Sequence, residues 1–162
     1  MDCSALLARA GALSAEGRHT EALALYESIL EENPEHVDAL NNRGCMMLEL
    51  KNYKEALLCF DRALALDPSG AGAWRNRGIA LSATGDRAMA MASLNQALAL
   101  REDFNDALID RARINLALGR FSDALADLDK ALQINPESAV LLNARACRAP
   151  PLERSTEPPI QD

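Results

Sequence analysis

The sequence is poor in the residues that favour β-sheets. Only 4% of its 162 residues are aromatic, and valine occurs at two positions, Val37 and Val140. The hydrophobic share of 49% consists mostly of alanine and leucine, which are good helix formers. Because strands are normally enriched in aromatic and β-branched residues, this composition predicts an all-α protein.

Sequence patterns for metal binding and catalysis are also lacking. The four cysteines include no C-x-x-C pair, and neither histidine lies beside one of them, so no metal site is expected. Cys45 and Cys59 lie in apolar helical runs and are interpreted as small buried hydrophobes. There is no Ser-His-Asp set and no glycine-rich phosphate loop, so we expect no catalytic residues, no cofactor and no enzyme.

Long apolar runs and an excess of positive charge are missing too. No stretch of 18 apolar residues could span a membrane, and the first residues lack the basic region of a signal peptide. The net charge of −7 disfavours contacts with nucleic-acid phosphates. Unpaired thiols suit a reducing compartment, so the sequence predicts a cytoplasmic protein without membrane or nucleic-acid partners.

What the chain does contain is a repeat with a period of 34 residues. The arginines in phase are Arg9, Arg43, Arg77, Arg111 and Arg145. An alanine column in the same phase is Ala22, Ala56, Ala90 and Ala124. Prolines follow at Pro34, Pro68 and Pro136. A fixed period of this length is typical of solenoid repeats.

Each unit reads as two helices. In residues 37–70 the first apolar series has the i, i+4, i+7, i+8 spacing of one helical face, and a second series follows a polar break at Lys51-Asn52. Asp67-Pro68 then ends the second helix. Glycine costs about 1 kcal/mol inside a helix, so Gly44 and Gly78 are expected where two helices pack closely, facing the alanine column.

These columns resemble the tetratricopeptide repeat family. The resemblance implies a right-handed solenoid of antiparallel helix pairs over residues 3–149, with repeats at 3–36, 37–70, 71–104 and 105–138. Residues 139–149 would form a capping fifth helix, and the proline-rich residues 150–162 are expected to be disordered. Glu102 stands where the family has proline, so the junction between the third and fourth repeats is the boundary least fixed by sequence.

The arginine column is interpreted as a structural seam between helices. The helical face that carries these arginines is expected to lie against the preceding repeat, where a partly buried charge needs a partner. An acid column in the second helices is the candidate: Glu27, Asp61, Asn95 and Asp129. Asn95 would interrupt this ladder of ion pairs. The sequence leaves open whether each arginine reaches its own repeat or the preceding one, and ligand binding by the arginines is the alternative. The predicted seam residues are Arg43, Arg77, Arg111, Gly44 and Gly78.

The resemblance also implies a concave groove lined by the first helix of each repeat. The groove residues that it implies are Asp38, Asn41, Asn42, Arg75, Asn76, Ile79, Asp106, Asp110 and Arg113. Side-chain amides there could bind a peptide backbone, arginines could bind acidic side chains, and aspartates could bind basic ones. The clamp by which some relatives hold a C-terminal carboxylate is not expected, because only Asn42 fits its pattern.

Three functions follow as hypotheses. The first is a non-catalytic scaffold that binds a protein or peptide in the groove. The alternative is a substrate-presenting region of a larger enzyme, since the repeats are similar to those of O-GlcNAc-transferase-like glycosyltransferases. The third is weak self-association through the ends of the solenoid.

Overall fold

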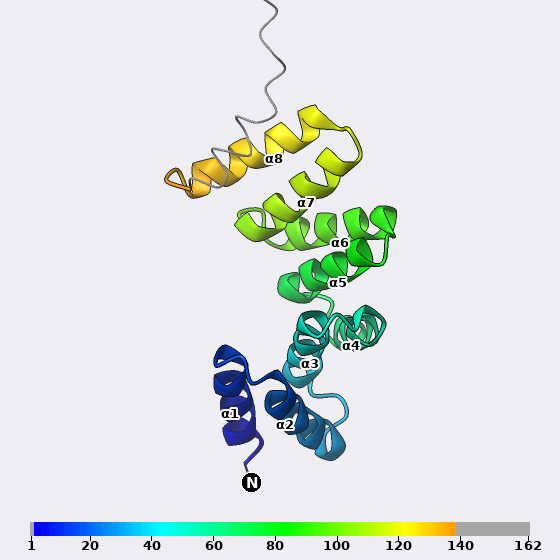
Figure 1. Cartoon of the computed structure of the whole chain (residues 1–162), viewed down its shortest axis with the longest axis vertical. Coiled ribbons are helices and arrows are strands. Elements are labelled where there is room, and N and C mark those ends of the chain that lie inside the picture. The colour runs from blue at the N-terminus through cyan, green and yellow to red at the C-terminus, as the bar shows by residue number, and fades with distance from the viewer. Residues whose placement is uncertain (1, 139–162) are drawn as a thin grey trace, which may run out of the picture.

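The structure, a computed structural model, describes residues 2–138. It consists of helices joined in sequence as antiparallel pairs that stack along one axis (Figure 1). The helices are α1 (Cys3–Ala15), α2 (His19–Glu32), α3 (Val37–Glu49), α4 (Tyr53–Leu66), α5 (Ala71–Ala83), α6 (Arg87–Leu100), α7 (Asn105–Ala117) and α8 (Phe121–Ile134). The described part of the chain contains no strand, as the composition predicted. The expected capping helix and tail lie outside the described residues.

The turn inside each helix pair reverses the chain through one left-handed residue. Gly17, Gly85 and Gly119 have positive φ angles of 76°, 91° and 73°. Glycine adopts this conformation without a steric penalty. In the second pair Lys51 takes the same role with a φ of 59°. The turn geometry is therefore kept even where a side chain must be accommodated.

The junction between α6 and α7 is as regular as the others, although it has no proline. Arg101 ends α6 in an extended conformation, and the N–H of Phe104 donates to the Arg101 carbonyl oxygen at 3.2 Å. The proline-containing turn after α2 has the same bond, from His36 to Asn33, at 3.1 Å. Proline only presets φ in such a turn. Here the buried Phe104 ring, which lies 3.5 Å under the Arg101 guanidinium, anchors the chain.

The core is built from columns that repeat along the stack. The alanine column of the second helices is completely buried. Next to it lie the large side chains of Tyr26, Phe60 and Leu94, which are also buried. Gly78 lies close to Ala90, since a Cβ built on it would be 3.2 Å from the Ala90 carbonyl oxygen. The predicted role of Gly44 needs a correction, because the atoms nearest to a Cβ built on it belong to the Phe60 ring, at 2.6 Å. Gly44 therefore makes room for an aromatic ring rather than for the small Ala56.

The stack curves towards its first helices. Within residues 2–138, the backbones of α1, α3, α5 and α7 approach one another in succession, whereas the backbones of the second helices of neighbouring pairs do not. Closer spacing on one side of a solenoid makes that side concave. The concave surface is thus formed by α3, α5 and α7 in the middle of the chain.

Candidate functional site

Three of the repeated arginines, Arg43, Arg77 and Arg111, each contact the second helix of the preceding pair and the second helix of their own pair. Each of three arginines reaches back to the residue 16 positions earlier, on the preceding helix pair. Arg77 Nε lies 2.6 Å from Asp61 Oδ1, and Arg43 Nη2 lies 3.7 Å from Glu27 Oε1. Arg111 Nη1 donates to Asn95 Oδ1 at 2.7 Å. Three members of the column predicted from sequence are therefore contacted. Asn95 interrupts the ladder of ion pairs, as predicted, but still accepts a hydrogen bond. The arginine 16 positions after Asp129 is Arg145, which lies outside the described part of the chain.

Each arginine also reaches forward to the residue 16 positions later, on its own helix pair. Arg43 Nη1 donates to Cys59 Sγ at 2.9 Å, and Arg77 Nη1 donates to Ser93 Oγ at 2.8 Å. Arg111 binds Asp127 with Nε and Nη2, at 2.9 and 2.6 Å. Sequence reasoning missed this second column, because a thiol, a hydroxyl and a carboxylate share no residue type.

The two columns together give each arginine one carboxylate and one neutral acceptor. Arg43 and Arg77 have their carboxylate on the preceding pair, whereas Arg111 has it on its own pair, in Asp127. These guanidinium groups are mostly buried, with side-chain exposures of 24%, 17% and 26%. A charge at that depth needs an opposite charge nearby, so the missing carboxylate at Asn95 is compensated by Asp127.

The residues implied for the groove lie on the three first helices that form the concave surface. Asp38, Asn41 and Asn42 come from α3, while Arg75, Asn76 and Ile79 come from α5, and Asp106, Asp110 and Arg113 from α7. Most are half-buried or exposed, but Asp110 is buried. The amide oxygen of Asn41 has no hydrogen-bond partner within the described residues.

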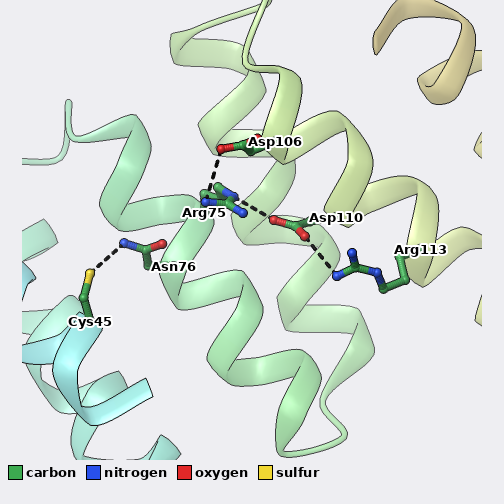
Figure 2. A network of polar contacts seen from close by, with 6 residues as sticks. All are labelled: Cys45, Arg75, Asn76, Asp106, Asp110 and Arg113. Carbon is green, nitrogen blue, oxygen red and sulfur yellow. Dashed lines mark hydrogen bonds and ion pairs between the residues drawn. The ribbon is translucent and has the colours of Figure 1, made fainter. Parts of the chain in front are cut away.

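The groove charges are paired with one another. Arg75 Nε lies 2.7 Å from Asp110 Oδ2, and Arg75 Nη1 lies 3.6 Å from Asp106 (Figure 2). Arg113 Nη1 approaches the other oxygen of Asp110 at 3.2 Å. The expectation that Asp110 is available to a basic ligand is therefore corrected, since both its oxygens are engaged. Arg113 stays 74% exposed.

A thiol takes part in the same surface. Asn76 Nδ2 donates to Cys45 Sγ at 3.2 Å, which links α5 to α3 (Figure 2). Burial raises the pKa of the Cys45 thiol to about 11, and the carboxylate of Glu49 acts in the same direction. The thiol therefore remains protonated at neutral pH.

Slow alkylation of Cys45 is the expected result. A pKa of about 11 instead of 9.0 leaves about 100-fold less thiolate, which is the reactive form. Iodoacetamide labelling at pH 8, quantified for each cysteine by peptide mass spectrometry, should show Cys45 reacting about 100 times more slowly in the folded chain than in urea. Equal rates in the two states would contradict the burial of this thiol.

Comparison with known families agrees with the repeat geometry. Profiles of the tetratricopeptide repeat match residues 7–71, 46–109 and 105–138. The chain belongs to the tetratricopeptide repeat family. The two acceptor columns around the arginines are defined by the contacts of this chain.

Solved tetratricopeptide repeat structures have the same fold. MamA from Desulfovibrio magneticus RS-1 superposes with a TM-score of 0.76 at 20% identity, covering 85% of this chain and 78% of that one. A Parabacteroides merdae repeat protein gives 0.77 at 20%, covering 90% and 57%. The first such domain of Spaghetti (RPAP3), bound to the HSP90 peptide SRMEEVD, gives 0.66 at 23%, covering 68% and 88%. No curated protein matches the sequence.

Among the described residues, no helix is both long and apolar enough to cross a membrane. The longest helices have 14 residues, which is short of the roughly 20 that a hydrocarbon core requires.

Proposed function

We propose that this tetratricopeptide repeat protein is a non-catalytic scaffold that binds an extended segment of a partner protein along its concave surface. The observation that carries the proposal is the row of asparagine amides on adjacent first helices, Asn41 and Asn42 on α3 and Asn76 on α5. An amide offers both a donor and an acceptor, as an extended backbone does. Such a row can hold a main chain without requiring one sequence.

Two further facts support a groove of this kind. Concave faces are the usual binding surfaces of solenoids, because neighbouring repeats extend them without interruption. The RPAP3 domain, which has the same fold at 23% identity, is bound to a peptide.

The test compares what the full chain captures with and without these amides. Immobilised wild type and the Asn42→Ala/Asn76→Ala variant are incubated with native lysate, and bound proteins are identified by mass spectrometry. We expect the variant to lose at least one protein that wild type holds, because two backbone-binding groups are removed. Circular dichroism should show both chains equally helical.

A matched control removes two amides from the second helices. Gln96→Ala/Gln133→Ala changes exposed residues of α6 and α8 and should leave the captured set unchanged. Identical sets for wild type and the groove variant would overturn the proposal. Loss of the same proteins in both double variants would equally do so, since the effect would then not belong to the concave surface.

A further inference from the structure

A pocket of about 220 Å³ opens between α5 and α7, beside the paired charges of the groove. Its lining is mainly apolar, with Gly78, Ile79, Ala83, Leu94 and Ile114, and is completed by Ser82, Asp110 and Arg113. A cavity of roughly 150 Å³ lined by apolar side chains is enough to hold benzene. This pocket can therefore hold one large apolar side chain.

The pocket exists because two columns carry residues here that are smaller than those of the preceding repeat. Leu94 stands where the preceding repeat has Phe60, and Ser82 stands where it has Leu48. In that preceding repeat, the Phe60 ring lies against Gly44, and Leu48 packs on the same cluster. The corresponding space beside Gly78 is left partly open, and it forms the hollow between the third and fourth helix pairs.

The exposed charge at this pocket is that of Arg113. Asp110 is buried, and its two oxygens face Arg75 at 2.7 Å and Arg113 at 3.2 Å. Asp106 lies on the far side of Arg75 and does not line the pocket. Arg113 contacts Asp110 through one nitrogen and is 74% exposed, so most of its donors point to solvent. Asp110 thus acts as a positioning residue that holds Arg113 at the pocket rim.

We infer that the partner segment places a large aliphatic or aromatic side chain in this pocket and an adjacent carboxylate, from Asp or Glu, on Arg113. The inference rests on the proposed groove function and specifies its ligand. Guanidinium groups bind carboxylates through paired hydrogen bonds. Burial of the neighbouring side chain against the apolar lining stabilises the complex. A partner with a basic residue at that point would meet an exposed positive charge instead.

The test selects peptides on the full chain. A phage-displayed library of random dodecapeptides is panned on wild type, and a fluorescein-labelled peptide with the enriched sequence is titrated by fluorescence polarisation. Enriched peptides should share a large apolar residue next to Asp or Glu. Ser82→Leu, which restores the residue of the preceding repeat, should fill the pocket and weaken binding about tenfold or more. Arg113→Glu should produce a similar loss and, when panned itself, should no longer enrich the acidic residue.

The controls separate this inference from the groove proposal. Ala92→Leu is the matched control, because α4 has Leu58 at the equivalent exposed position, and it should bind like wild type. Peptides lost by Asn42→Ala/Asn76→Ala but unaffected by Ser82→Leu and Arg113→Glu would overturn the inference and leave the groove function standing. Failure of wild type to enrich any peptide would overturn both. The circular dichroism spectrum of Ser82→Leu should match that of wild type. If Ser82→Leu does not fold, Ser82→Met takes its place in the titration.

Discussion

Asp127→Asn is expected to lower the free energy of unfolding by about 2 kcal/mol, the usual scale for a charged hydrogen bond that loses its charge. Asp127 is the carboxylate for Arg111, and its own side chain is only 7% exposed. Asparagine keeps the shape and one acceptor. The other acceptor of Arg111 is Asn95, which is neutral, so the variant leaves the guanidinium without any of its observed carboxylates. Urea denaturation followed by far-UV circular dichroism measures the loss.

The chain itself supplies the rescue. Arg77 has its carboxylate on the preceding pair, in Asp61, and a hydroxyl on its own pair, in Ser93. Asn95→Asp/Asp127→Ser would give Arg111 the same arrangement and should recover most of the lost stability. Asp123→Asn, an exposed change on the same helix, should stay within about 0.5 kcal/mol of wild type. Equal stability of Asp127→Asn and Asp123→Asn would show that the pairing is not required.

Gly44→Ala is the second substitution with a large expected effect. We expect it to lower the free energy of unfolding, although helix propensity alone would predict an increase. Replacing glycine by alanine inside a helix normally adds about 1 kcal/mol of stability. At this position the new Cβ would lie 2.6 Å from the Phe60 ring, which is completely buried. Overpacking of this kind costs about 1 to 3 kcal/mol, so after subtraction of the propensity gain we expect a net loss of about 1 kcal/mol. The midpoint of urea unfolding should fall accordingly.

Two companion variants identify the cause. Gly72→Ala, at a helical glycine of α5 with nothing within 4 Å of its new Cβ, should stabilise the chain. In a Phe60→Leu background, Gly44→Ala should cost less than it does with the ring present, and a double-mutant cycle gives the difference. The same cost in both backgrounds would mean that the Phe60 ring is not the obstacle.

The period of 34 made most of the fold predictable. Arginine, alanine and glycine columns recur in fixed phase, so the helix pairs and the stripe that meets the preceding repeat follow from spacing alone. The missing proline at Glu102 gave a misleading signal, because the buried Phe104 and its turn hydrogen bond fix the chain there. Local sequence preference was overridden by packing, as it often is at helix ends.

The polar contacts were less predictable, since they depend on side-chain reach. The acid column was visible because three of its members are acids. The second column was hidden by its mixture of Cys59, Ser93 and Asp127, and only its spacing of 16 residues from each arginine could have revealed it. The burial of Asp110 between two arginines also needed coordinates, because helical phase gives the face of a residue but not its partners.

The change in which helix pair supplies the carboxylate constrains how such a chain could grow by tandem duplication. A second copy of residues 37–70 would place its Arg43 against the Asp61 of the first copy and its own Cys59, and the arginine would keep one opposite charge. A second copy of residues 71–104 would place its Arg77 between Asn95 and Ser93, with none. The third unit is therefore a poor template for lengthening the array, although its backbone is as regular as that of its neighbours.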